Sequence, residues 1–130
     1  MADQNYFEDV SVGDAIPALS VTVDQTQMFF FSAATYNGHR IHYDRDYVTR
    51  IEGYPDLVIH GPLLALLALE LPRLRVPGQA VGAFEYRLVR PAFAPATVVA
   101  VGQPARDGIV ELTVAAVGAE PSLTARAVLE

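Results

Sequence analysis

Residues 61–71 read Gly-Pro-Leu-Leu-Ala-Leu-Leu-Ala-Leu-Glu-Leu, and this stretch decides the fold. Pro62 suits the first position of a helix, and leucine and alanine favour a helix over a strand. Apolar residues occupy almost every side of this helix, so we expect most of its faces to be buried. Pro72 and the Pro77-Gly78 pair predict where the segment ends. The sequence therefore predicts one buried central helix.

Strand-like segments, rich in valine, leucine and aromatic residues, follow this helix. They cover residues 80–89, 97–103, 109–117 and 122–129. Arg106-Asp107-Gly108 and residues 118–121 carry turn signals between them. A turn at Gly13-Asp14 and a short strand over residues 19–23 precede the helix. One buried helix and a run of antiparallel strands predict an α+β fold of the hot-dog type, a single domain over residues 1–130 in which the sheet curls around the helix.

Two shorter helices and a polar loop are predicted ahead of the central helix. Asp24 is a candidate N-cap for a helix that runs through Ala34. Asp44 caps a second helix, with Asp46 as its first-turn acid, and Gly53 ends it. Residues 36–42 between these helices are polar and contain glycine, which predicts a loop. Three aromatic residues of this half are expected in the core: Phe29, Phe30 and Tyr36.

Charge and hydropathy exclude several classes of partner. The chain has 15 acidic and 9 basic residues, and this balance argues against a nucleic-acid partner, which normally requires a basic stripe. No positive segment followed by an apolar run marks a signal peptide at the start. The longest apolar stretch begins near Leu57, is interrupted by His60 and ends at Glu70, too short for a bilayer core of about 30 Å. We expect a cytoplasmic protein without a membrane partner.

Cysteine and motif content narrow the chemistry. The sequence has no cysteine, which excludes thiol catalysis, disulfides and thiolate metal sites. His39-x-x-His42 has no carboxylates at ligand spacing, so no metal site is expected. A Gly-rich phosphate loop, a nucleophile elbow and a dinucleotide fingerprint are all absent from the sequence.

Residues 31–44, Phe-Ser-Ala-Ala-Thr-Tyr-Asn-Gly-His-Arg-Ile-His-Tyr-Asp, resemble the hydratase motif of the MaoC-like family. Its partner Val-Ile-His-Gly-Pro-Leu-Leu at 58–64 lies at the right distance and resembles the start of the family's central helix. The Arg-Pro-Ala-Phe turn at 90–93 and the strands extend the resemblance over most of the chain. The branch that the sequence resembles contains mesaconyl-CoA-type hydratases and the dehydratases of mitochondrial-type fatty-acid synthesis.

The family motif reads Gly-Asp-x-Asn-Pro-Ile-His, and its aspartate and histidine flank a catalytic water. Ile41 and His42 match its end, Asn37 stands where the aspartate belongs, and His39 and Arg40 stand at the Asn-Pro positions. The resemblance implies a lyase that reversibly hydrates a 2-enoyl-CoA to an (R)-3-hydroxyacyl-CoA. It implies no cofactor beyond the coenzyme A thioester that carries the substrate.

Physical chemistry supports the same roles. Hydration of a conjugated thioester needs a base for the water, an acid for the α-carbon and donors for the enolate oxygen. The His42 imidazole suits the base, whereas Asn37 can orient a water but exchanges no proton. The first amides of the central helix are unpaired and lie at its positive end. Pro62 has no N–H, which leaves Gly61 and Leu63, and the resemblance points to Gly61 as the donor to the thioester carbonyl.

Four further residues are candidates for substrate binding: Arg40, His39, His60 and Leu63. His39 also suits a position behind the residues that touch the substrate, or a position at the surface of the protein. His60 precedes the helix, where a backbone hydrogen bond is the simpler role. Coenzyme A phosphates and surface salt bridges explain Arg40, Arg87 and Arg90 equally well.

Two other functions stay open. Hot-dog thioesterases usually carry a carboxylate on the central helix, but the only acid there is Glu70, far from the Gly61 amide. A non-catalytic subunit of a hetero-oligomeric hydratase is the second alternative, and Asn37 favours it. Because a lone chain would expose its helix and a sheet edge, we expect a homodimer or a heterodimer with another hot-dog subunit. The residues do not distinguish coenzyme A from an acyl-carrier protein.

Overall fold

The computed structural model describes residues 16–76 and 78–130, so the turn expected at Gly13-Asp14 lies outside the described residues. Five strands form an antiparallel sheet in the order β1-β5-β6-β7-β3, and β2 pairs with β4 in a small second sheet. In chain order the elements are β1 (Ile16–Val23), α1 (Gln25–Ala34), the 3-10 helix η2 (Arg40–His42), α2 (Arg45–Arg50), β2 (Leu57–Val58), α3 (Gly61–Arg75), β3 (Val81–Leu88), β4 (Phe93–Ala94), β5 (Ala96–Pro104), β6 (Ile109–Ala116) and β7 (Leu123–Leu129).

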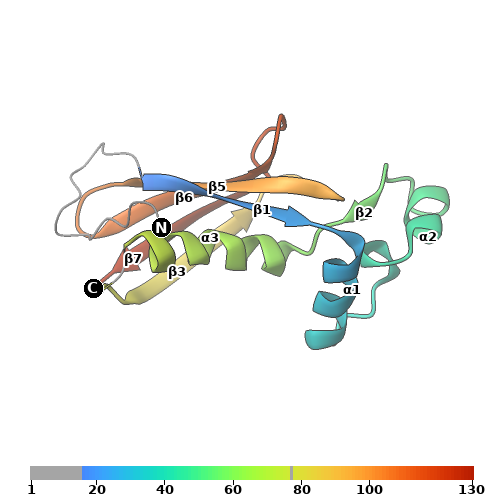
Figure 1. Cartoon of the computed structure of the whole chain (residues 1–130), viewed down its shortest axis with the longest axis horizontal. Helices are drawn as coiled ribbons and strands as arrows, with labels where there is room; N and C mark the ends of the chain where they lie inside the picture. Colours follow the sequence, from blue (N-terminus) through green and yellow to red (C-terminus); the bar gives the residue numbers. More distant parts are fainter. Residues whose placement is uncertain (1–15, 77) are drawn as a thin grey trace.

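Helix α3 lies along the main sheet and contacts all five of its strands (Figure 1). Its buried residues include Leu64 and Leu71, which join inward-facing strand residues such as Val98 and Leu112 in one core. Gly102 on β5 lets the helix come close, because a Cβ there would lie 2.7 Å from the Leu71 Cδ2 atom. The prediction of an α+β fold, with an antiparallel sheet against a central helix, is confirmed.

The prediction that Pro72 closes the central helix is wrong, because α3 continues to Arg75. Proline removes one N–H donor, yet the next turn closes when the Val76 N–H donates to the Pro72 carbonyl at 2.8 Å. The Arg75 guanidinium then donates to the Pro17 and Ala18 carbonyls at 3.3 and 3.1 Å. These contacts join the end of α3 to β1, which is far away in the sequence. They therefore stabilise the extra turn of α3.

The prediction that Phe29, Phe30 and Tyr36 belong to the core is also wrong, because all three are exposed, Tyr36 by 99%. Helix α1 lies beyond one end of the main sheet, together with α2 and β2 (Figure 1). Only one of its sides meets the rest of the domain, and that side buries Met28 and Ser32. The inward face of α1 therefore carries Met28 and the Ser32 hydroxyl, whereas the rings of Phe29 and Phe30 are exposed.

Local signals around the short helices are read correctly, with one exception. The Asp24 carboxylate accepts from the Gln27 N–H at 2.9 Å, and that of Asp44 from the Tyr47 N–H at 3.0 Å, which confirms both predicted caps. The exception is the expected loop over residues 36–42, whose last three residues form η2. Strand β4, which the sequence did not indicate, holds β2 in place beside η2.

Candidate active site

Three short elements meet at one end of the central helix. The η2 turn ends at His42, β2 ends at Val58, and α3 begins at Gly61. The Ile59 N–H donates to the Ala92 carbonyl at 2.8 Å, which continues the β2–β4 pairing towards the helix. The residues so gathered line a pocket of about 380 Å³, which also receives Leu64, Leu88 and Arg90.

His42 is held by its backbone neighbour and is 8% exposed. Its Nδ1 lies 2.6 Å from the Val58 carbonyl oxygen. Because a carbonyl only accepts, Nδ1 carries the proton and donates it, and the lone pair of the neutral ring is on Nε2. Burial lowers the pKa of His42, the charge of His39 lowers it further, and the Val58 hydrogen bond opposes both. A neutral imidazole with a free Nε2 lone pair can act as a general base.

His60 lies directly behind His42. The two rings stack with their centroids 3.9 Å apart and their planes 18° apart. His60 is 1% exposed, and its Nε2 is hydrogen-bonded to the Ser32 hydroxyl at 2.7 Å. The partner of the ring is thus a side chain, whereas the backbone hydrogen bonds of His60 are made by its carbonyl, which accepts from the Leu63 and Leu64 N–H groups. Burial, followed by repulsion from His42, lowers the pKa of His60 to about 4 and keeps its ring neutral.

Gly61 and Leu63 line different pockets and differ in the hydrogen bonds of their N–H groups, although both belong to the first turn of α3. Gly61 lines the pocket of His42, and a Cβ at this position would collide with the Leu88 side chain. The Leu63 N–H donates to the His60 carbonyl at 3.1 Å, so the expectation of a second free donor there is wrong. The Leu63 side chain lines a different, apolar pocket of about 400 Å³ beside Val21 and Phe30.

Asn37 does not share the pocket of His42. Its side-chain oxygen accepts from the His39 N–H at 3.2 Å. Asn37 lines a neighbouring pocket of about 330 Å³, together with Ser32 and Tyr43. The Asn37 side-chain amide therefore stabilises the loop ahead of η2. It lines a pocket that is separate from the pocket of His42.

The remaining basic candidates lie at the surface. The Arg40 guanidinium pairs with Asp44 at 3.0 Å and stacks 4.3 Å above the Tyr47 ring. His39 is exposed, and its ring centroid lies 6.1 Å from that of His42. Its Nδ1 accepts from the Ile41 N–H at 3.4 Å. These contacts favour the surface interpretation of both side chains.

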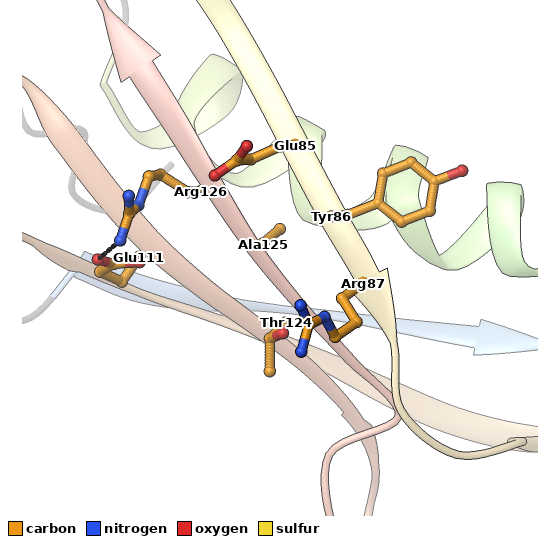
Figure 2. A pocket seen from close by; sticks show the side chains of 7 residues that line it. All are labelled: Glu85, Tyr86, Arg87, Glu111, Thr124, Ala125 and Arg126. Carbon is orange, nitrogen blue, oxygen red and sulfur yellow. Dashed lines mark hydrogen bonds and ion pairs between the residues drawn. The ribbon is translucent and has the colours of Figure 1, made fainter.

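A hollow on the main sheet, away from His42, carries a ladder of charges (Figure 2). Glu85 on β3 and Glu111 on β6 flank Arg126 on β7, and the Arg126–Glu111 pair measures 3.2 Å. Arg87 lines the same hollow, whereas Arg90 lines the pocket of His42. Alternating charges at exposed cross-strand positions stabilise a sheet modestly, so we assign this hollow no chemistry.

Two features are absent from residues 16–76 and 78–130. Within them, no three histidine, aspartate or glutamate side chains come together in a way that could hold a metal ion. None of the helices in this part of the chain has the length and the hydropathy needed to cross a membrane.

Residues 8–94 match the family model described as hydroxyacyl-thioester dehydratase type 2. Over 98 residues the chain is 46% identical to the mesaconyl-C(4)-CoA hydratase of Chloroflexus aurantiacus, which covers 75% of this chain and 34% of the relative. It is 41% identical over 86 residues to the mitochondrial hydroxyacyl-thioester dehydratase type 2 of Schizosaccharomyces pombe, 65% of this chain and 26% of the relative. The chain thus spans about a third of one relative and a quarter of the other.

Solved structures share the fold. An (R)-hydratase from A. caviae superposes with a TM-score of 0.81 at 20% identity, over 95% of this chain and 98% of the other. The ChsH1-ChsH2 complex of Mycobacterium tuberculosis gives 0.78 at 23% identity, over 92% and 97%. At this level of identity the likeness shows the fold alone, and it confirms the predicted hot-dog architecture.

The buried His60 predicts a stability that falls in acid. Its pKa is about 4 in the folded chain and higher in the unfolded chain. Between these two pH values the unfolded chain binds more protons, so the free energy of unfolding decreases as the pH falls, by about 2–3 kcal/mol at most. Urea denaturation at neutral pH and near pH 4 measures this loss. The His60→Phe variant should lose less stability than the wild type, and equal losses would contradict the assignment.

Proposed function

The chain belongs to the hydroxyacyl-thioester dehydratase type 2 family, and from this premise we propose that it reversibly adds water to a 2-enoyl-CoA thioester. The product is a 3-hydroxyacyl-CoA, and the resemblance of residues 31–44 and 58–64 to the MaoC-like family favours its (R) configuration. The name of the mesaconyl-C(4)-CoA hydratase supports coenzyme A as the carrier. One observation carries the proposal: a neutral histidine and the first residue of α3 line the same pocket.

His42 and the Gly61 amide have different roles in the proposed reaction: His42 moves the protons, and the amide stabilises the thioester oxygen. His42 Nε2 takes a proton from water while the water oxygen bonds to the β-carbon. The electron pair of the double bond moves towards the thioester oxygen, where the Gly61 N–H stabilises the developing charge. The α-carbon then takes the proton from His42, so that one water is added overall. Among the described residues that line this pocket, His42 alone has an imidazole or a carboxyl group, and it therefore serves as base and acid in turn.

The same pocket argues against hydrolysis of the thioester. No aspartate or glutamate belongs to the described residues that line it. Glu70, the only acid on α3, lies towards the far end of the helix and accepts a hydrogen bond from Arg73 at 2.7 Å. The proposed reaction consists of the addition of water to the β-carbon and the protonation of the α-carbon, and because neither step changes the overall redox state, it requires no redox cofactor.

Substrate binding is proposed at the rim of the site. Arg90 lines the pocket, where its Nε donates to the Pro121 carbonyl at 2.8 Å and its Nη2 lies 4.0 Å from a Glu120 carboxylate oxygen, so an anionic group of the substrate would compete with Glu120 for this guanidinium. Arg40 and His39 lie on the η2 side, where exposed basic groups can meet coenzyme A phosphates. His60 is too deeply buried to contact the substrate itself.

We also propose that the chain works as a dimer, with itself or with a second hot-dog subunit. Strand β3 is an edge strand with mostly exposed residues, and it offers unpaired backbone groups. Phe30 on α1 and Leu66 on α3 are exposed apolar side chains that a partner would cover. A chain of this fold occurs in the ChsH1-ChsH2 complex, which is a precedent for assembly with a second subunit.

His42→Ala should lower kcat/KM for a 2-enoyl-CoA by about 10²-fold or more, because general base catalysis contributes roughly 10²–10⁴. The absorbance of the conjugated thioester follows turnover across a panel of acyl chains. Arg106→Ala, in the exposed turn after β5, is the matched surface control and should leave turnover unchanged. A folded His42→Ala variant with full activity would remove His42 from the mechanism.

Asn37→Asp should preserve or raise hydration, because a carboxylate retains the acceptor that binds the His39 N–H and can also move a proton. Asn37→Ala should lower kcat, but by less than His42→Ala does, since it removes an amide that orders the loop ahead of η2 and exchanges no proton. Inactivity of both the wild type and Asn37→Asp on every thioester would favour the non-catalytic subunit. Activity would then return only when a partner subunit is added.

Light scattering at micromolar concentration should give the mass of a dimer for the chain alone, or for the chain with its partner subunit. A charged residue in place of the exposed Leu66, as in Leu66→Glu, should shift the population towards the monomer if α3 contributes to the interface. Val117→Glu, at an exposed position beyond β6, is the matched control. A monomer in every mixture would be decisive evidence against the dimer.

A further inference from the structure

Three polar side chains from separate elements form a row behind the pocket. Ser32 comes from α1, His60 precedes α3, and His42 ends η2. The Ser32 hydroxyl is hydrogen-bonded to His60 Nε2 at 2.7 Å, and the His60 ring stacks on the His42 ring at 3.9 Å. All three are buried, so the row lies within the packed interior of the domain.

The row of Ser32, His60 and His42 contains a group that lowers the stability of the folded chain. His60 Nδ1 is buried and has no hydrogen-bond partner in the described part of the chain. A buried polar atom without a partner destabilises the folded chain, because it has given up its hydrogen bonds to water. An alanine at 32 and a phenylalanine at 60 would fill similar space without that penalty, since replacing both partners of a buried hydrogen bond is often neutral. The retained imidazole therefore requires an explanation other than packing.

We propose that Ser32 and His60 are positioning residues for the base. Ser32 fixes the rotation of the His60 ring, and the flat face of that ring holds the His42 imidazole in the plane set by the Val58 carbonyl. The Phe31 ring meets His60 edge-on, with centroids 4.7 Å apart, and supports it from its own helix. The inference rests on the proposed function, because it concerns the geometry of the same base.

The charge state of the row suits this role. During hydration His42 becomes an imidazolium, and a second charge on the stacked ring would oppose it. The low pKa of His60, about 4, keeps that ring neutral throughout the neutral range. Other charged or titratable groups also lie near His42. His39 and Arg40 adjoin it in the chain, Arg90 lines the pocket after β3, and α2, which packs against η2, carries Arg45, Asp46, Tyr47 and Arg50. The elements α1 and β2 offer only uncharged groups.

Nuclear magnetic resonance can test this positioning without an activity assay, because the chain contains only 3 histidines. In Ser32→Ala, His60 Nε2 loses its partner, so its ring should leave the stacked position. The His42 Cε1–H signal should then lose its ring-current shift, and the pKa of His42 should rise towards its ordinary value. We expect kcat/KM to fall about tenfold or more, since small misplacements of a catalytic group are costly.

Ser122→Ala is the matched control. Ser122 is likewise buried, but its hydrogen bonds to Val114 and Val89 are made by backbone atoms that alanine retains. Its variant should leave the His42 signal, its pKa and kcat/KM unchanged. Ser32→Ala with the same unchanged values would overturn the proposal.

Two substitutions of His60 separate the ring face from the rest of the side chain. His60→Phe retains a flat ring and should keep both the ring-current shift and the lowered pKa of His42. His60→Ala removes the ring and should lose both. Equal pKa values of His42 in the two variants would overturn the positioning role. If the signals change as expected while the wild type hydrates no thioester, the proposed function fails and the positioning of His42 remains.

Discussion

The hydrogen bond from His42 Nδ1 to the Val58 carbonyl is the contact on which the site depends. It joins η2 to β2, two elements that no regular sheet or helix connects. Strand β2 is only two residues long, and its pairing with β4 keeps that carbonyl in place. The bond therefore positions His42 relative to the small β2–β4 sheet. It also fixes the tautomer of the His42 ring.

The first turn of α3 adds the second half of the site through the same short connection. Only two residues separate β2 from Gly61, so the carbonyl that holds His42 and the first residue of α3 are placed together. Proline at position 62 removes one donor and the His60 carbonyl occupies the Leu63 amide. The end of the helix is thereby reduced to a single donor near the base, where its positive dipole end also favours developing negative charge.

Local signals predict much of this fold, and long-range contacts account for the errors. The caps at Asp24 and Asp44 depend on residues three positions away, and the apolar run of α3 needs no knowledge of its partners. The pairing of Ser32 with His60 joins residues 28 positions apart, and no spacing rule indicates it. The exposure of Tyr36 likewise depends on where α1 lies relative to the sheet, and the sequence does not specify that position.

The buried row also lies between two separate pockets. Ser32 lines the pocket of Asn37, while His42 lines the pocket of Gly61, and His60 connects the two. Asn37 is joined to the row through its backbone, because its N–H donates to the Ser32 carbonyl at 2.8 Å. Hydrogen bonds are directional, whereas apolar contacts are not, so a polar row can fix the orientation of a ring as well as its position.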